Sequence, residues 1–489
     1  MRRRRDPEIR SGSARDAAAF RLGLAYDDVL LVPRRSSLRS RREVSTRAPF
    51  TRRIELALPI VSANMDTITE SAMAIALARL GGIGVVHRFL TIDRQAAEVA
   101  RVKRFLNYVI DEPYTIEPER TLAEARSELE RRGVGGLVVT DRDGVLLGLL
   151  TARDVRAEAG ERLVREAMTP RERLVTAPPG IGLDEASRLM RAHRVEKLPL
   201  VADGRLAGLI TLRDVDLRSS LPQATRDERG RLRVAAAVGV RGDTLERAEA
   251  LLAAGCDALV LDIAHGHSDQ AVERLRELKH AWPDADVVAG NVATADGVRD
   301  LAAAGADAVK AGIGPGFVCT TRLVAGAGVP QLTCVLDCGR AAAEAGVALI
   351  ADGGIRRPAD VAKAIAAGAD TVMVGSLLAG TRETPGRVVV RNGRRYKVYR
   401  GMASRSAAEA RLELEGLEDA LDQYVPEGVE RVAPLKESVD EVVAELAGGL
   451  RSAASYVGAR DLREFRERAE FVRITAAGRR ESEPGGEIE

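Results

Sequence analysis

The sequence predicts an α/β protein built around a closed (β/α)8 TIM barrel, and two observations carry this prediction. Short segments rich in β-branched and small apolar residues recur eight times, and from the third onward each precedes a helical pattern such as Asp243–Ala254 or Asp360–Ala367. Alternating strands and helices form parallel βαβ units, and eight units favour a closed barrel over an open doubly wound sheet. The expected strands are Pro59–Asn64, Gly82–Arg88, Val234–Gly239, Ala258–Ile263, Asp286–Val292, Ala308–Ile313, Ala348–Gly354 and Thr371–Ser376.

A foreign segment, Val109–Leu221, interrupts this pattern between the second and third strands. It contains an internal repeat, because Thr121–Val155 and Gly182–Val215 both run helix, strand, Asp-Gly turn, strand and Thr-x-Arg-Asp-Val. Such repetition indicates two similar units packed together. The segment resembles a tandem pair of CBS motifs, a Bateman module, which implies an adenine or guanine nucleotide between the copies. Asp154 and Asp214 match positions that bind ribose in such modules, and helix capping explains them equally well.

Three segments are therefore expected along the chain. Residues 1–108 form the first part of the barrel, residues 109–221 the tandem CBS regulatory domain, and residues 222–489 the second part of the barrel with a flap and a C-terminal segment. Aromatic residues make up only 3% of the chain, so Leu, Val, Ile and Ala must fill the core.

Composition gives no reason to expect a nucleic-acid or membrane partner. The chain has 74 basic and 72 acidic residues, so its formal net charge is only +2. No apolar run reaches the ~18–20 residues of a membrane span, and the N-terminus lacks the apolar core of a signal peptide. We therefore expect a cytoplasmic protein, and we interpret the basic run Arg2–Arg5 as a solvated terminus.

A glycine-rich loop, GIGPGFVCTTR (Gly312–Arg322), follows the sixth expected strand. It therefore starts at the C-terminal rim of the barrel, where such enzymes place their chemistry. Cys319 lies in this loop beside two threonines and Arg322. A thiol of ordinary pKa, ~8.5, becomes a good nucleophile when backbone N–H groups or a nearby cation lower that pKa. Inert packing is the alternative, but on an exposed glycine loop we favour a nucleophilic Cys319.

Two further glycine turns predict a phosphate site at the same rim. Asp352-Gly353-Gly354 ends the seventh strand, and Gly375-Ser376 ends the eighth. TIM barrels commonly bind phosphate at these two loops, where open backbone N–H groups meet an anion. Asp352 suits ribose hydroxyls rather than phosphate. Asp262 and Asn291 end the fourth and fifth strands, so these polar groups should converge.

Seven motifs are together highly specific, and they run through nearly the whole chain. They are GLAYDDVLLVP (Gly23–Pro33), PIVSANMDTITE (Pro59–Glu70), GNVAT (Gly290–Thr294), GIGPGFVCTTR, ADGGI (Ala351–Ile355), MVGSLLAGT (Met373–Thr381) and YRGMAS (Tyr399–Ser404). With these motifs the chain resembles the family of IMP dehydrogenase and GMP reductase.

The resemblance implies a purine nucleotide substrate, an NADPH or NAD cofactor, a monovalent cation, and a homotetramer or octamer. It implies that Cys319 attacks C2 of the purine, and that Thr321 and Glu427 handle a proton. The implied nucleotide pocket consists of Ser62, Met65, Asn291, Asp352, Gly353, Gly354, Gly375, Ser376, Tyr399, Gly401 and Met402. The implied cofactor contacts are Asp262, Ala264, Gly312 and Gly314, and carbonyls of Gly314, Gly316 and Cys319 match a potassium site. Phe317 departs from the family, which usually has a phosphate-binding serine there.

The flap sequence favours one direction of the family chemistry. Dehydrogenases oxidise IMP with NAD, and an adjacent Arg-Tyr pair in their flap supplies the base that activates water. The corresponding stretch here, Arg405–Glu430, has no such pair, since Arg411 and Tyr424 are far apart in sequence. General-base help is worth ~10²–10⁴-fold, so its loss should cripple hydrolysis. We therefore predict an NADPH-dependent GMP reductase that converts GMP to IMP and ammonia.

Two segments, Leu261–Ser268 and Ser455–Leu462, also read more like reductases, whereas the CBS insert is the usual mark of dehydrogenases. The alternatives are an IMP dehydrogenase with an unusual base and a catalytically inactive nucleotide sensor, which the intact Cys-Thr-Glu set disfavours. His265 and His267 are spaced poorly for a metal pair, and a supporting or cofactor-contacting role suits them better.

Overall fold

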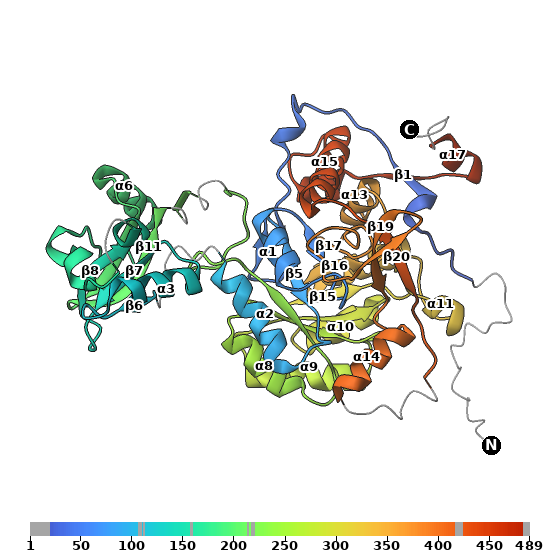
Figure 1. Cartoon of the computed structure of the whole chain (residues 1–489). Helices are drawn as coiled ribbons and strands as arrows, with labels where there is room; N and C mark the ends of the chain where they lie inside the picture. Colours follow the sequence, from blue (N-terminus) through green and yellow to red (C-terminus); the bar gives the residue numbers. More distant parts are fainter. Residues whose placement is uncertain are drawn as a thin grey trace, which may run out of the picture.

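The computed structural model describes residues 20–105, 110, 113–156, 160–212, 215–216, 221–415 and 424–482. Its centre is a closed barrel of parallel strands in the order β12-β13-β14-β15-β16-β17-β4-β5, which confirms the predicted TIM barrel (Figure 1). The ring closes where β5 pairs with β12. The strands are β4 (Ile60–Ser62), β5 (Ile83–Val86), β12 (Ala235–Val238), β13 (Ala258–Asp262), β14 (Asp286–Val292), β15 (Ala308–Ala311), β16 (Ala348–Asp352) and β17 (Thr371–Val374).

Each barrel strand is followed by a helix that packs outside the ring, including the first two strands. Local sequence sets several starts: the Thr294 hydroxyl accepts from the Gly297 N–H, and Pro358 occupies the first turn of its helix. A capping hydroxyl accepts a hydrogen bond from an unpaired N–H of the first turn, and a proline in that turn lacks an N–H that would otherwise stay unpaired. The outer helices are α1 (Ser71–Arg79), α2 (Ile92–Arg104), α8 (Thr244–Ala253), α9 (Asp269–Ala281), α10 (Ala295–Ala303), α12 (Gln331–Ala345), α13 (Pro358–Ala366) and α15 (Val439–Val457).

The interior of the barrel is filled by alanine, valine and isoleucine, as the low aromatic content predicted. A short hairpin of β2 (Ala48–Pro49) and β3 (Glu55–Leu56) brings Phe50, Ile54 and Leu56 into the same apolar cluster. Small side chains fill the inner layers because eight strands leave little room. Asp262, Asn291 and Asp352 lie at or next to the carboxyl ends of their strands.

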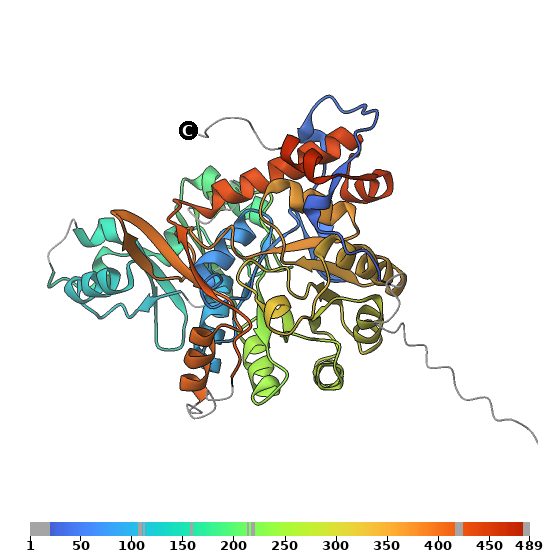
Figure 2. The ribbon, with the colours of Figure 1, turned by 90° about the vertical axis from the view of Figure 1, so that its right-hand side faces the viewer.

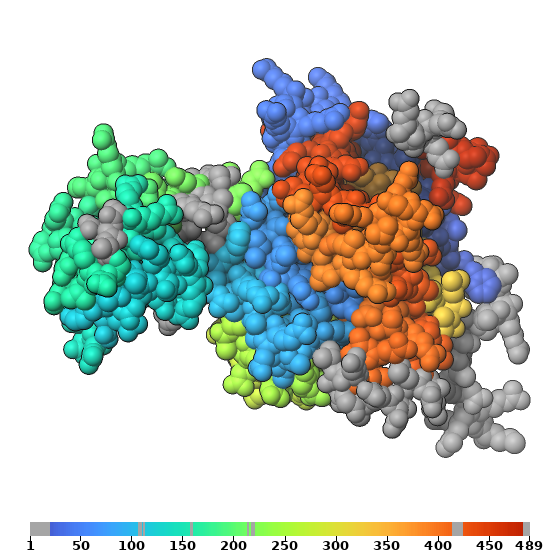
Figure 3. Space-filling view, in the orientation of Figure 1, coloured from blue at the N-terminus to red at the C-terminus, as the bar shows by residue number. Residues whose placement is uncertain are grey.

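The insert lies between β5 and β12 and forms two small sheets, β6-β7-β8-β9 and β10-β11 (Figure 1). In the space-filling view it stands beside the barrel as a separate lobe (Figure 3). Its elements are β6 (Thr115–Ile116), α3 (Leu122–Arg132), β7 (Gly136–Thr140), β8 (Leu146–Thr151), α4 (Ala152–Arg156), α5 (Val164–Ala167), β9 (Thr169–Pro170), α6 (Leu183–His193), β10 (Lys197–Ala202) and β11 (Arg205–Thr211).

The chain after β17 builds a three-stranded sheet and the elements that flank the barrel mouth. The sheet has the order β18-β19-β20, and Figure 2 shows the long α15 lying along the barrel. The remaining elements are β1 (Val29–Leu31), which pairs with β21 (Phe471–Arg473), α11 (Thr321–Val324), β18 (Val388–Arg391), β19 (Arg394–Arg400), α14 (Arg405–Glu415), β20 (Glu430–Pro434), α16 (Leu462–Arg468) and α17 (Ala476–Glu481). Within the described ranges, no helix combines the length and apolarity of a membrane span.

Candidate active site

A cavity of about 400 Å³ opens at the carboxyl ends of the barrel strands, where the sequence predicted the site. Strand ends, the glycine loop and the segment before β20 all contribute to it. The predicted site residues that line it are Met65, Asp262, Ala264, Asn291, Gly312, Gly314, Gly316, Cys319, Thr321, Asp352, Gly401, Met402 and Glu427.

Cys319, Thr321 and Glu427 form a hydrogen-bonded series in this cavity. The sulfur of Cys319 lies 3.2 Å from Thr321 Oγ1, and the Thr321 hydroxyl donates to Glu427 Oε2 at 2.8 Å. Cys319 is partly exposed, whereas Cys256, Cys334 and Cys338 are buried. The structure therefore presents the cysteine that sequence reasoning chose, with a hydroxyl and a carboxylate beside it. Arg322 donates to the Val329 carbonyl.

Backbone pairing brings Glu427 to the loop. The Thr320 N–H donates to the Glu427 carbonyl at 2.8 Å, and the Val429 N–H donates to the Val318 carbonyl at 2.9 Å. Gly428 lies between these contacts, where an added Cβ would stand 3.0 Å from the Ser404 nitrogen. A glycine permits this close approach of two backbones.

Lys310 is a site residue that the sequence reasoning missed. Its ammonium group donates to Asp262 Oδ1 at 2.9 Å, to Asp352 Oδ2 at 2.8 Å and to Asn291 Oδ1. The Lys310 side chain is only 2% exposed. A buried ammonium is stable only when paired, so Lys310 and its acceptors form one unit. The sequence signal that could have identified Lys310 is that it is the single charged residue within the apolar strand β15, Ala308–Ala311.

The electrostatics of this unit favour ionised side chains. Burial alone would lower the pKa of Lys310, but the charges of Asp262 and Asp352 outweigh it and raise the pKa above its ordinary value. Burial would likewise raise the pKa of Asp262, but the Lys310 ammonium holds that pKa below its ordinary value. Asp262 was predicted to contact the cofactor and Asp352 the ribose, and both carboxylates accept hydrogen bonds from the one Lys310 ammonium.

A smaller, more enclosed pocket of about 90 Å³ adjoins the cavity and contains the predicted phosphate turns. Gly353 and Gly354 have φ of +91° and +79°, a backbone conformation that favours glycine. In the described part of the chain, the N–H groups of Gly353, Gly354, Gly375 and Ser376 donate no hydrogen bond. Unpaired amides in the loops after β16 and β17 suit a phosphate group.

Two predicted nucleotide residues line neither cavity. Ser62 is fully buried at the end of β4 and accepts from the Thr69 hydroxyl at 2.9 Å. Tyr399 is 3% exposed in β19, and burial raises its pKa against the opposing effect of Arg431. In the structure both therefore belong to the packing around the site.

A larger cavity of about 880 Å³ continues from the Asp262 side of the site. The two cavities share Arg88, Phe89, Asp262, Ile263 and Arg411, so they are contiguous. Four arginines and two aspartates, Asp243 and Asp262, line the larger cavity, so its lining has a net positive charge, and sequence reasoning named none of its arginines as site residues. Its arginines are Arg88, Arg241, Arg247 and Arg411.

The residues predicted for potassium and for an allosteric nucleotide make the following local contacts. The Gly316 carbonyl accepts from the Cys319 N–H at 3.1 Å. The Asp154 carboxylate accepts from the Thr151 N–H at 2.8 Å and caps α4, and it lies outside the insert's main cavity. Asp214 falls outside the described residues. Across the described ranges, no group of three or more His, Cys, Asp or Glu side chains is arranged to hold a metal.

The insert has its own basic cleft of about 650 Å³ between its two halves. The first half contributes three arginines, and the second half contributes an arginine, a lysine and a single carboxylate. These residues are Arg153, Arg156, Arg173, Arg194, Lys197 and Glu196.

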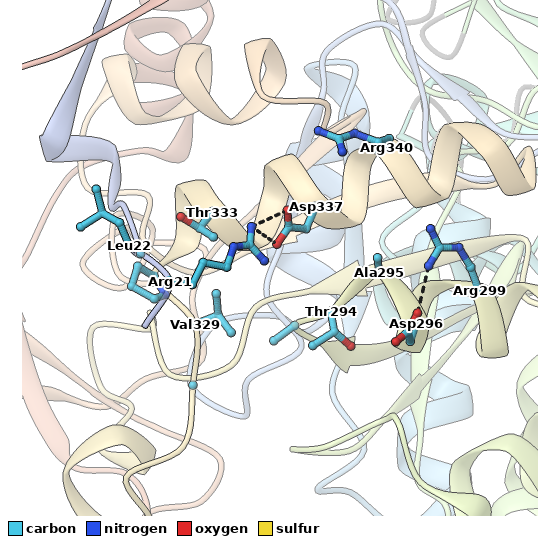
Figure 4. Close-up of a pocket in the computed structure, with 14 residues that line it drawn as sticks. Arg21, Leu22, Thr294, Ala295, Asp296, Arg299, Val329, Thr333, Asp337 and Arg340 are labelled. Atoms are coloured by element: carbon cyan, nitrogen blue, oxygen red, sulfur yellow. Dashed lines mark hydrogen bonds and ion pairs between the residues drawn. The ribbon is translucent and has the colours of Figure 1, made fainter. Parts of the chain in front are cut away.

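A further cavity of about 670 Å³ lies outside the barrel between α10, α12 and the N-terminal segment (Figure 4). Its arginines are partly neutralised, since Arg21 pairs with Asp337 at 2.7 Å and Arg299 with Asp296 at 2.9 Å. None of the predicted site residues lines it. The rim cavity therefore remains the candidate active site.

The fold and the site define a (β/α)8-barrel protein with a cysteine, a threonine and a glutamate joined at the carboxyl-end rim. Residues 23–485 match the model of the IMP dehydrogenase / GMP reductase domain. The chain belongs to this family, and it is accordingly an oxidoreductase of purine nucleotide metabolism.

Curated relatives and solved structures carry different family names. The chain is 48% identical over 470 residues to an inosine-5'-monophosphate dehydrogenase of Nitrosopumilus maritimus, covering 95% of this chain and 98% of that protein. It is 50% identical over 465 residues to that of Aquifex aeolicus, covering 94% of each chain. A GMP reductase from Trypanosoma brucei in complex with guanosine 5'-monophosphate superposes with a TM-score of 0.90 at 45% identity, covering 96% of this chain and 99% of that one.

Proposed function

We propose that the chain is a GMP reductase that uses NADPH to convert GMP to IMP and ammonia. The balanced reaction consumes GMP, NADPH and two protons, and it yields IMP, NADP⁺ and ammonium. The observation that supports the shared chemistry is the Cys319–Thr321–Glu427 series, with contacts of 3.2 and 2.8 Å, because it suits a nucleophile beside a proton route. The direction of the reaction rests on the flap, Arg405–Glu430, which has no adjacent Arg-Tyr pair.

In the proposed reaction the Cys319 thiolate adds to C2 of the purine, and the C2–N bond breaks as ammonia leaves. Glu427 passes a proton through the Thr321 hydroxyl to the departing nitrogen. The bound cofactor supplies a hydride to C2. The C–S bond then breaks, which returns the electron pair to Cys319 and releases IMP. Asp352 accepts from the ribose hydroxyls, and the amides of Gly353, Gly354, Gly375 and Ser376 bind the phosphate.

The basic cavity beside Asp262 supports a phosphorylated cofactor. It fits a dinucleotide, since it continues from the rim cavity and has a volume of about 880 Å³. Arg247 is committed to Asp243, Gln95 and the Leu90 carbonyl, so it anchors this wall. Arg241 extends the positive charge along the cavity, which favours NADPH over NADH through its extra phosphate.

One observation favours the alternative, an IMP dehydrogenase that oxidises IMP to XMP with NAD. Arg411 and Tyr424 are distant in sequence, yet both line the rim cavity. The Tyr424 hydroxyl donates to the Ala403 carbonyl at 2.9 Å, and burial raises its pKa while Arg411 acts to lower it. The fold therefore brings an arginine and a tyrosine of the flap together despite the missing adjacent pair.

A single absorbance experiment decides between the two directions. The purified chain is given GMP with NADPH in one cuvette and IMP with NAD in another, each with and without potassium. We expect loss of NADPH absorbance with GMP, formation of IMP, and none of this with Cys319→Ala. Steady NADH formation with XMP as product would establish the dehydrogenase instead.

The remaining features of the proposal concern regulation and assembly. The basic cleft of the insert suits a nucleotide polyphosphate, as expected of a tandem CBS module, and a homotetramer or octamer follows from family resemblance. Potassium would bind the carbonyls of Gly314, Gly316 and Cys319. The Gly316 carbonyl already accepts one hydrogen bond, and a carbonyl's second lone pair leaves it able to bind a cation. Cytoplasmic localisation is part of the same proposal.

A further inference from the structure

The segment that carries Glu427 runs antiparallel to the catalytic loop beyond the glutamate itself. Thr320 pairs with Glu427, Cys319 forms a bridge with Gly428, and Val318 pairs with Val429. In an antiparallel pair each step along one strand is a step back along the other. The next residues to meet are therefore those at the start of β20 and those around Phe317.

Arg431 and Phe317 make that next contact. The Arg431 guanidinium lies over the Phe317 ring, 5.3 Å from its centroid, and Phe317 is 55% exposed. Arg431 also faces Tyr399 across the β19–β20 pairing. Within the described ranges, the Arg431 side chain has no hydrogen bond or ion pair. Stacking occupies the flat face of a guanidinium and leaves its N–H edge free to bind an anion.

Phe317 also lines the pocket that contains Gly353, Gly354, Gly375 and Ser376. The charged residues that line this pocket are Asp352 and Arg356. Arg356 is committed elsewhere, since its guanidinium pairs with Asp27 at 2.7 Å. The pocket thus offers backbone amides for an anion. Arg431 does not itself line the pocket, but it lies over Phe317, which does, and it has no carboxylate partner among the described residues.

We propose that Arg431, held on the Phe317 ring, binds the 5'-phosphate of the substrate nucleotide and so holds the segment Glu427–Arg431 against the catalytic loop. The inference rests on the proposed nucleotide site and deepens it. A guanidinium makes charge-assisted, bidentate hydrogen bonds to phosphate oxygens. Because Arg431 and Glu427 belong to one short segment, phosphate binding would hold the glutamate in its contact with Thr321. Phosphate recognition and assembly of the proton route are then one event.

The test compares a nucleotide with the nucleoside that lacks its phosphate. Binding of GMP and of guanosine to the full-length chain is measured by calorimetry for Arg431→Met, which keeps the apolar stem and removes the charge. We expect the Kd for GMP to rise about ten- to hundredfold, as for loss of charged hydrogen bonds, and the Kd for guanosine to change less than about twofold. Arg431→Lys should fall between Arg431→Met and the unmodified chain.

Two comparisons make the result specific. Arg391→Met removes an exposed arginine of the same sheet and should change neither Kd. Phe317→Ala removes the stacking platform, so it should weaken GMP binding, and adding it to Arg431→Met should cost much less than the two separate effects combined. Melting temperatures confirm that each variant is folded.

The proposal is overturned if Arg431→Met binds GMP normally, or if GMP and guanosine weaken by the same factor. Failure of the proposed function looks different. If the unmodified chain makes XMP from IMP, the reaction direction is wrong, and the Arg431 comparison can then be made with IMP and inosine, which differ by the same phosphate.

Discussion

Thr321 donates a hydrogen bond of 2.8 Å to Glu427, although the two residues are 106 positions apart. The same hydroxyl lies 3.2 Å from the sulfur of Cys319. A hydroxyl between a thiol and a carboxylate can accept a proton from one side and release it on the other. In the proposed reaction, this contact makes the flap a part of the reaction centre.

Removing either side of this contact should slow catalysis without unfolding the chain. We expect Glu427→Gln and Thr321→Val each to lower kcat by ~10²–10⁴-fold, because each breaks the proton route. Thr320→Val is the matched control, because the Thr320 hydroxyl makes no hydrogen bond among the described residues. This variant should keep kcat within about threefold of the unmodified chain. A kcat for Glu427→Gln close to that of the unmodified chain would show that the proton travels elsewhere.

Lys310→Met should make stability depend on pH. The lysine's raised pKa and the lowered pKa of Asp262 keep both groups ionised, so the contribution of this pair to stability should be flat between about pH 5 and 8. Without the cation, burial raises the Asp262 pKa above its unfolded value of ~3.9. In Lys310→Met the pKa of Asp262 would therefore be higher in the folded state than in the unfolded state. The variant would then be most stable below the unfolded pKa, and it would lose stability as the pH rises through the folded pKa.

Urea unfolding at several pH values measures this change. We expect Lys310→Met to lose about 3 kcal/mol at pH 7 and to recover part of it near pH 5. Lys397→Met is the control, since among the described residues that buried lysine donates only to the carbonyls of Arg382 and Thr384. Its loss should be the same at both pH values. A pH-independent loss for Lys310→Met would refute the electrostatic account.

Adjacent glycines in α15 should respond in opposite directions to alanine. An added Cβ at Gly448 meets nothing within 4 Å, so Gly448→Ala should stabilise the chain by about 0.5–1 kcal/mol through helix propensity. At Gly449 the added Cβ would stand 2.2 Å from Pro358 Cβ, so Gly449→Ala should destabilise by at least ~1–3 kcal/mol through overpacking against α13. Thermal melting of the two variants checks the sign, and equal shifts would contradict the packing.

The insert cleft should respond to nucleotide triphosphates through its cations. We expect ATP or GTP to change the kinetics of the full chain. Lys197→Ala should raise the nucleotide concentration that gives half of this effect about tenfold. Arg142→Ala is the control, since that side chain is 88% exposed and lies outside the cleft. Deleting residues 109–221 should abolish the response. Kinetics indifferent to nucleotides before and after deletion would remove regulation by the insert.

Features with a local cause were visible in the sequence. Strand and helix alternation follows from side-chain periodicity, so the barrel was predicted correctly, and the same periodicity marked the repeat within the insert. Cys319 and the turns at Gly353 and Gly375 were predicted as site residues because glycines clustered directly after a barrel strand are typical of loops that bind a ligand through their backbone. Each of these signals lies within about a dozen neighbouring residues.

Contacts between distant segments required the tertiary structure. Lys310 looks like any strand lysine until the barrel closes and leaves its ammonium facing Asp262 and Asp352. Arg411 and Tyr424 share a cavity, and Arg431 covers Phe317, only because the segment before β20 folds back on the catalytic loop. Residue types and spacing determine the barrel and the position of Cys319 on its rim, since short-range sterics act along the chain. Which charges meet across the rim depends on backbone pairing between remote segments, which no local pattern encodes.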